Sequence, residues 1–124
     1  MTRKKRVPDA SALRLRLRVE IKGAIALGPG RVDLLEQIAE TGSFVEAAHR
    51  LEMSYMRAWT LIRDTYAAFR EPLVVVERGG GQRGGGAKRT VTGKRALDRH
   101  RNVERDATDV TRLKWLQRRR LLKS

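Results

Sequence analysis

The sequence predicts a fold that is mainly α with a small β-wing and a long helix at its C-terminal end. Three observations support this prediction. Apolar residues recur at helical spacing between residues 31 and 71, a glycine-rich segment separates two short β-like runs, and no helix breaker follows Gly93. We expect a basic arm over residues 1–12, a folded domain over 13–93, and a long basic helix over 94–124 that serves as a dimerisation element or tail.

The first expected element is a strand. From Leu13 to Lys22, aliphatic residues alternate with charged ones. A period of two places the aliphatic side chains on one face of a half-buried strand and the charged ones on the other. The triplet Gly28-Pro29-Gly30 then breaks the chain.

Two helices are expected next. Apolar residues from Arg31 to Thr41 have helical spacing, and Gly42 marks the end of the first helix. The segment Ser43-Phe44-Val45-Glu46 has the pattern of a capping box, in which Ser43 and Glu46 bond reciprocally to free amides and start a short second helix. Its inward residues are expected to be Ala47, Ala48 and Leu51.

A third helix follows after only two or three residues, with Ser54 as its N-cap. Large apolar residues recur there at steps of four and three, which predicts a core-facing stripe that ends at Glu71-Pro72. The stripe consists of Tyr55, Trp59, Ile62, Tyr66 and Phe69.

A hairpin and a long helix complete the chain. Leu73–Val76 and Lys88–Thr92 are expected to be the two strands, and Lys94–Leu122 a single basic helix. The apolar residues of that helix form a thin stripe, more typical of a docking or dimer seam than of a core helix. They are Leu97, Val103, Ala107, Val110, Leu113 and Leu116.

The charge favours a polyanionic partner. Lys and Arg number 28 against 14 Asp and Glu, a formal net charge of +14, which suits nucleic acid or an anionic membrane face. The excess lies outside residues 31–71, where acidic side chains outnumber basic ones. The sequence has no cysteine and no long apolar segment, so we expect a cytoplasmic protein, associated with the nucleoid, without disulfides, signal peptide or membrane span.

The order of the expected elements is that of a winged helix-turn-helix, in which the later helix of the pair enters the DNA major groove. If Trp59 and Ile62 face the core, Met56, Arg57 and Thr60 point away from it. Arg57 can then offer its fork to a guanine, Thr60 can contact a base or a phosphate, and Met56 can lie against a thymine methyl group. The residues expected to contact DNA from this helix are Ser54, Tyr55, Met56, Arg57, Thr60 and Arg63, with Tyr55 either packing or reaching a phosphate. The alternative for these residues is that they form an ordinary solvated face of an amphipathic helix. Ser43, at the start of the preceding helix, is expected at the DNA backbone.

The glycine-rich segment is expected to be a wing that contacts the DNA backbone or the minor groove. Glycines permit close approach to phosphates, and the basic side chains neutralise them. The expected contacts are Arg78, Gln82, Arg83, Lys88 and Arg89; the alternative is a flexible loop. The glycines also match G-x-G-x-x-G, but no βαβ unit follows, so a dinucleotide site is not expected.

Catalytic and metal signals are weak. His49 and His100 lie far apart, we assign no i+3 or i+4 ligand partner to either, and Glu46 with His49 would supply only two ligands. Ser43 and Ser54 are better explained as helix caps than as nucleophiles. We expect no enzyme, no metal and no cofactor.

The sequence resembles the N-terminal DNA-binding domain of the ModE family of molybdate-responsive regulators, which is similar to the winged helix of LysR-type regulators. The resemblance covers about residues 13–97 and rests on Leu34–Ala39, Thr41-Gly42-Ser43, Ala47-Ala48, Met53-Ser54-Tyr55, Ala58-Trp59, the wing over 79–86 and Thr92-Gly93. It implies a homodimer on a palindromic operator, with Ser54, Tyr55, Met56 and Arg57 opening the recognition helix and the last helix supporting dimerisation.

Full-length members carry C-terminal oxyanion-binding domains, whereas this sequence ends after a basic helix. We therefore expect no molybdate site here, although the regulated genes can still be linked to molybdenum or tungsten. Two other functions compete with this interpretation. One is a basic nucleoid-associated or RNA-binding protein without sequence preference, and the other is an adaptor that docks through the long helix.

Overall fold

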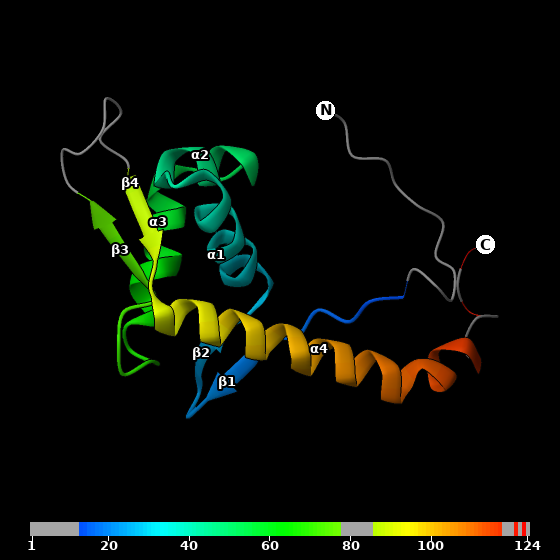
Figure 1. Ribbon diagram of the computed structural model, residues 1–124. Helices are drawn as coiled ribbons and strands as arrows, with labels where there is room; N and C mark the ends of the chain where they lie inside the picture. The colour runs from blue at the N-terminus through cyan, green and yellow to red at the C-terminus, as the bar shows by residue number, and fades with distance from the viewer. Residues whose placement is uncertain (1–12, 78–85, 118–120, 122, 124) are drawn as a thin grey trace.

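The computed structural model describes residues 13–77, 86–117, 121 and 123. Its architecture is mainly α with a small β-wing, as predicted: a winged helix-turn-helix that carries a long C-terminal helix (Figure 1). The elements are β1 Val19–Ile21, β2 Ala24–Leu27, α1 Pro29–Thr41, α2 Phe44–Arg50, α3 Tyr55–Thr65, β3 Val74–Glu77, β4 Gly86–Arg89 and α4 Val91–Gln117.

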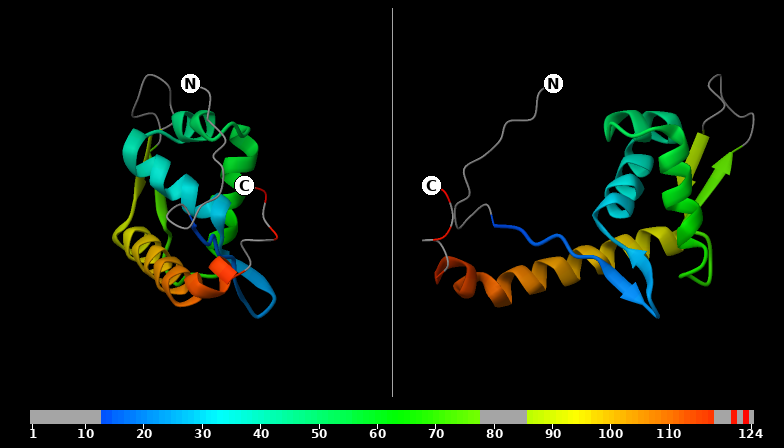
Figure 2. Two further views of the ribbon diagram at one scale, coloured as in Figure 1. Left: turned by 90° about the vertical axis from the view of Figure 1, so that its right-hand side faces the viewer. Right: turned by 180° about the vertical axis from the view of Figure 1, so that it is seen from behind.

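The elements form a body, which consists of α1, α2, α3 and the β3–β4 hairpin, and an arm. From here on, the arm is the part of α4 from Arg101 to Gln117, and not the basic segment over residues 1–12. Figure 1 shows α1, α2 and α3 packed together, with the β3–β4 hairpin at one side of them and α4 running beneath. Figure 2 shows that α4 continues well past the body and that the N-terminal stretch runs along the same direction. The body encloses one apolar core, whose fully buried large side chains include Val32, Leu34, Leu35, Ile38, Phe44, Ile62 and Leu73.

The N-terminal stretch is extended, but only its end is a strand. Burial alternates from Leu13 to Glu20 as predicted, with the aliphatic side chains half-buried and the charged ones exposed. The strand expected from Leu13 is nevertheless too long, because the amides of Leu15 and Leu17 bond to side chains of α4 instead of to a neighbouring strand. We call residues 13–18 the strap.

A short hairpin that the sequence analysis did not predict joins the strap to α1. β1 pairs antiparallel with β2 across the two-residue turn Lys22-Gly23. Both turn residues have positive φ, 53° and 82°, which a tight two-residue hairpin requires and which glycine adopts without strain.

The predicted helix end at Gly42 and the N-caps Ser43 and Ser54 are confirmed. Gly42 ends α1 in the left-handed conformation, and its amide donates to the Ile38 carbonyl at 2.8 Å. Ser43 Oγ accepts from the Glu46 amide at 3.1 Å, and Ser54 Oγ accepts from the Arg57 amide at 3.1 Å. The capping box is not reciprocal as predicted, because the Ser43 amide donates to Thr41 Oγ1 rather than to Glu46.

The third helix is shorter than expected, and its buried face is different. α3 ends at Thr65, where the following amides turn to partners three residues back, and Tyr66 lies exposed beyond it. The fully buried positions are Ala58, Ile62 and Thr65, with Trp59 only half-buried. The predicted aromatic stripe is thus partly wrong, because small residues face the core where the helices approach closely.

The returning strand was predicted too long. β4 ends at Arg89, and Thr90 caps α4 by accepting the Gly93 amide on Oγ1 at 2.9 Å. Val91 and Thr92 therefore begin a helix. Gly93, in the first turn of α4, must be a glycine because a Cβ there would stand 2.2 Å from the Leu73 carbonyl oxygen. α4 therefore packs directly against the start of the wing.

Three of the six residues in the apolar stripe predicted for the long helix are exposed, and Ala107 and Leu116 are half-buried. Leu97 is buried, but Val103, Val110 and Leu113 are 51%, 80% and 71% exposed. After Leu97, the inward positions of α4 are His100, Glu104 and Thr108. The joint between arm and body is therefore polar, a feature that the sequence analysis did not anticipate.

Candidate nucleic-acid interface

A tight turn connects α2 to α3. Leu51 ends α2, Glu52 has φ 57°, and the Met53 amide donates to the Ala48 carbonyl at 3.0 Å. Ser54 then caps α3. The amides of Leu51, Glu52 and Met53 are all hydrogen-bonded to carbonyls of α2, and these bonds restrict the direction in which α3 leaves the turn.

Aromatic packing holds the beginning of α3 against α2. The ring of Phe44 lies 5.6 Å from that of Tyr55 and 5.8 Å from that of Trp59, both tilted. Phe44 is 1% exposed and Ala58 is fully buried. The N-terminal turn of α3 is thus anchored on one side and open on the other.

The open side carries the residues predicted for DNA contact. Tyr55 is 48% and Met56 68% exposed, Arg57 is exposed, and Thr60 is half-buried. Tyr55 packs against Phe44, one of the two alternatives considered for it, while its exposed part keeps the predicted phosphate contact sterically open. Among the described residues, the Arg57 guanidinium has no hydrogen-bond or ion-pair partner, whereas Arg63 approaches Asp64 at 3.5 Å.

The base of the wing lies beside the start of α2. Gly86 forms a β-bridge with Ser43, and the Ala87 amide donates to the Gly42 carbonyl at 3.1 Å. Ser43 adjoins Phe44, which touches Tyr55 and Trp59. The beginnings of α2 and α3 and the tip-side end of β3–β4 are therefore neighbours on one side of the body.

The predicted wing residues are placed differently from one another. Lys88 is exposed opposite Val75, whereas the stem of Arg89 lies near Gly93, at the α4 end of the hairpin. Arg78, Gln82 and Arg83 lie outside the described residues. Ser43 and Ser54 both have their hydroxyl oxygens occupied as caps.

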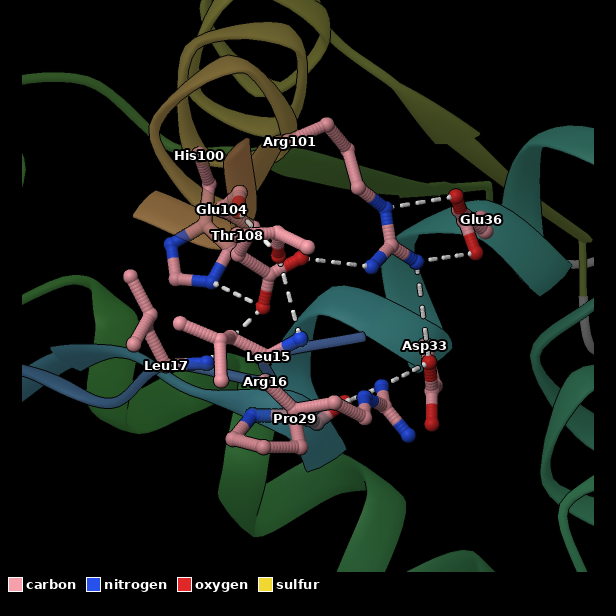
Figure 3. A network of polar contacts seen from close by, with 10 residues as sticks. All are labelled: Leu15, Arg16, Leu17, Pro29, Asp33, Glu36, His100, Arg101, Glu104 and Thr108. Carbon is pink, nitrogen blue, oxygen red and sulfur yellow. Dashed lines mark hydrogen bonds and ion pairs between the residues drawn. The ribbon is translucent and has the colours of Figure 1, made fainter. Parts of the chain in front are cut away.

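A second cluster of functional side chains, which sequence reasoning missed, lies at the arm joint (Figure 3). Glu104 Oε2 accepts the Leu17 amide at 2.9 Å and lies 3.2 Å from His100 Nε2, and its Oε1 accepts from Arg101 at 3.0 Å. The prediction that His100 has no i+4 partner is therefore wrong, because Glu104 lies in that position. We call the connected side chains the joint network: Arg16, Asp33, Glu36, His100, Arg101, Glu104 and Thr108.

The joint network shifts the pKa values of two of its members, Glu104 and Arg101. Burial alone would raise the pKa of Glu104, but the Leu17 amide, the Arg101 hydrogen bond and the neighbouring His100 and Arg101 side chains lower that pKa below its ordinary value. Burial alone would lower the pKa of Arg101, but Glu36 and Glu104 raise it. Glu104 is therefore held as a carboxylate and Arg101 as a cation.

One signal in the sequence could have revealed this network. His100, Glu104 and Thr108 follow Leu97 at steps of three and four, so they continue the buried face of the helix. Polar residues at such positions are normally interpreted as solvent-facing. Within the described part of the chain, no three His, Asp or Glu side chains gather in a way that could hold a metal ion, and no helix there is long and apolar enough to cross a membrane.

Comparison with known proteins gives consistent similarities. No protein-family model matches the chain. It is 36% identical to the molybdenum transport protein ModE of Azotobacter vinelandii over 72% of its length, covering 33% of that protein. It is 37% identical to the transcriptional regulator ModE of Yersinia pestis over 65% of its length, covering 30%. A transcriptional regulator ModE of Haemophilus influenzae is 33% identical over 72% of the chain, with 34% covered.

The chain spans about a third of the length of these curated relatives. Identity persists across most of the chain, and the names describe transcription regulation or molybdenum transport. The chain is therefore similar, over most of its length, to about a third of each of these ModE proteins.

Proposed function

We propose that this chain is a sequence-specific, DNA-binding transcriptional regulator that acts in the cytoplasm as a homodimer. The observation that carries the proposal is the beginning of α3: it is anchored by Phe44, capped by Ser54, and presents Met56 and Arg57 to solvent beside the wing. A recognition helix needs this combination of a fixed backbone and free side chains.

Each exposed side chain has a chemical role in this proposal. Arg57, with no described partner, offers two parallel donors to a guanine edge. Met56 lies against a thymine methyl group, and Thr60 and Tyr55 contact a base or a phosphate. Ser54 and Ser43 bring the two helix beginnings, with their free amides, close to the DNA backbone. Arg63 supplies a further phosphate contact once it leaves Asp64.

The wing adds contacts to the backbone or to the minor groove. Lys88 is the exposed cation on the described part of the hairpin, and Arg78, Gln82 and Arg83 extend the same segment. Arg89 contributes charge at the α4 end of the hairpin. Such contacts position the protein and confer salt dependence, while the base contacts of α3 confer specificity.

A second copy of the chain covers the exposed apolar stripe of α4 in this proposal. Val103, Val110 and Leu113 are exposed along α4, at spacings suited to a helix–helix seam. Val110→Asp should convert the dimer to a monomer in sedimentation experiments without DNA. Val91→Asp is the matched control, because Val91 is also exposed but lies away from this stripe.

The similarity to ModE suggests that the regulated genes are linked to molybdenum or tungsten. The proposal assigns the described residues to DNA binding and dimerisation, and it assigns no molybdate site to them. A signal would then reach this chain through another protein or another domain.

The proposal is tested by selecting bound DNA from a random pool at physiological salt, with the unmodified chain, Arg57→Ala and Arg105→Ala. Arg105 is exposed on α4, away from both α3 and the apolar stripe, and serves as the charge control. An inverted repeat should emerge, and Arg57→Ala alone should relax base preference at one position of each half-site. No enriched sequence, with equal weakening by both variants, would instead identify a charge-driven binder and refute the proposal.

A further inference from the structure

The arm is joined to the body mainly by polar contacts. Near its beginning, α4 packs through Gly93 and Leu97, but the next inward positions are His100, Glu104 and Thr108. Beyond them α4 extends past the body with the strap beside it (Figures 1 and 2). The direction of the arm therefore depends on what happens around residues 100–108.

Three segments meet there. Arg101 reaches α1, where its Nε donates to Glu36 Oε2 at 3.0 Å and a terminal nitrogen lies 2.6 Å from Glu36 Oε1. The same guanidinium lies 3.7 Å from Asp33 Oδ1, which Arg16 of the strap approaches at 2.5 Å. α4, α1 and the strap are thus linked through a single chain of charges (Figure 3).

The strap is also held from the helix side. Glu104 Oε2 accepts the Leu17 amide, and Thr108 Oγ1 accepts the Leu15 amide at 3.2 Å while donating to the Glu104 carbonyl at 2.8 Å. Alternate amides of the strap are therefore fixed by residues one helical turn apart on α4. The side chains of His100 and Glu104 are 3% and 6% exposed, and the two bonds to the strap amides are partly buried.

Hydrogen bonds and forked ion pairs depend on direction, whereas apolar burial does not. An apolar joint would let α4 pivot on Leu97; a network with fixed partners on α1 and the strap allows one orientation. From Arg101 to Gln117 the arm is roughly 24 Å long at 1.5 Å per residue, so a 10° pivot displaces its end by about 4 Å. That is close to the step between base pairs, about 3.4 Å.

We infer that the joint network, through Arg101 and its partners Glu36 and Asp33, sets the angle between α4 and the recognition helix and thereby the half-site spacing that the dimer accepts. This inference rests on the proposed function, since only a dimer joined through α4 converts that angle into a spacing. The network residues are positioning residues, because none of them lies on the α3 surface.

The variant that tests the inference is Asp33→Asn with Glu36→Gln. These side chains are 31% and 38% exposed, and their neutralisation leaves Arg101 paired with Glu104, so the body should still fold. The matched control is Glu40→Gln, which removes another α1 carboxylate whose partner, Arg50 at 3.1 Å, belongs to α2.

The first readout needs no DNA. The chain has no cysteine, so spin labels can be placed at His49→Cys on α2 and Gln117→Cys at the end of α4, with excess unlabelled chain to suppress distances between copies. The unmodified chain and Glu40→Gln should give one narrow distance distribution, and the double variant a broader one. Equal widths in all three would overturn the inference, whether or not the chain binds DNA specifically.

The second readout uses a library of two inverted half-sites separated by spacers of different length. The unmodified chain and Glu40→Gln should select one spacer, and the double variant should lose roughly fivefold of that preference, with unchanged base preference within each half-site. A broader distance distribution with an unchanged spacer preference would overturn the spacing claim. If the unmodified chain selects no inverted repeat, the proposed function fails together with the spacing claim, while the spin-label distances separately show whether the network fixes the arm.

Discussion

The helical body and the joint between α4 and that body are stabilised by different physical means. The body relies on apolar burial around Phe44, Leu35 and Ile62, with serine caps at the starts of α2 and α3. The joint relies on a buried carboxylate, Glu104, and on half-buried charged side chains whose partners come from three segments. Apolar packing tolerates small adjustments of shape, whereas a charged network loses its partners when geometry changes. Under our inference, the body supplies stability and the joint sets the orientation of α4.

The largest expected effect falls on the body. Phe44→Ala should reduce the free energy of unfolding by about 3 to 5 kcal/mol, because it removes a fully buried ring that supports Tyr55 and Trp59. Chemical denaturation measures this loss. The adjacent, exposed Val45→Ala should change stability by less than about 1 kcal/mol, and similar losses for both would mean that Phe44 is not the anchor of α3.

A substitution in the joint network should reduce the free energy of unfolding by less than Phe44→Ala does. Arg101→Ala should reduce the free energy of unfolding by about 2 to 3 kcal/mol, because the buried Glu104 and the partly exposed Glu36 both lose the guanidinium that pairs with them. Arg105→Ala, one turn further along α4, should stay within about 0.5 kcal/mol of the unmodified chain. Equal effects at both positions would show that the network contributes no more than surface charge.

The two regions should also differ in their response to acid. The pKa of Glu104 is lowered in the folded protein, so its contribution is present above the ordinary value of 4.5 and is lost as pH falls through the lowered value. The stability gap between the unmodified chain and Glu104→Gln should therefore shrink as pH falls below 4.5, as measured by urea denaturation across that range. A gap that stays constant or widens in acid would contradict the assigned direction.

The smallest effect is expected at the cap of the recognition helix. Ser54→Ala should reduce stability by about 1 kcal/mol, and Ser54→Gly by only a few tenths of that. Thermal unfolding of both variants checks the order. If Ser54→Ala proved neutral, the bond to the Arg57 amide would not be what fixes the beginning of α3.

The same contrast explains what the sequence could predict. Caps and terminators depend on neighbouring residues, so Gly42, Ser43 and Ser54 were identified from the sequence, and so was the side of α3 that carries Met56 and Arg57. The end of β4 was misjudged because Thr90 suits both a strand and an N-cap, and the choice depends on how closely α4 approaches Leu73.

The joint could not be predicted by the same reasoning. His100 and Glu104 look solvent-facing until the Leu17 amide, 87 residues away in sequence, is brought against them. The aromatic stripe of α3 failed for a related reason: Tyr66 continues the helical period, but the helix ends at Thr65. Long-range partners and the points where helices end decided these cases, and local periodicity reports neither of them.

The most direct test of the proposed function is the ratio between the affinity for the selected inverted repeat and the affinity for scrambled DNA of equal length, both measured at physiological salt. A sequence-specific regulator should give a ratio of roughly a thousand or more. The ratio should fall sharply for Arg57→Ala and stay unchanged for Arg105→Ala. A ratio near one for the unmodified chain, with affinity that depends steeply on salt, would show that charge alone binds the DNA and would contradict the account.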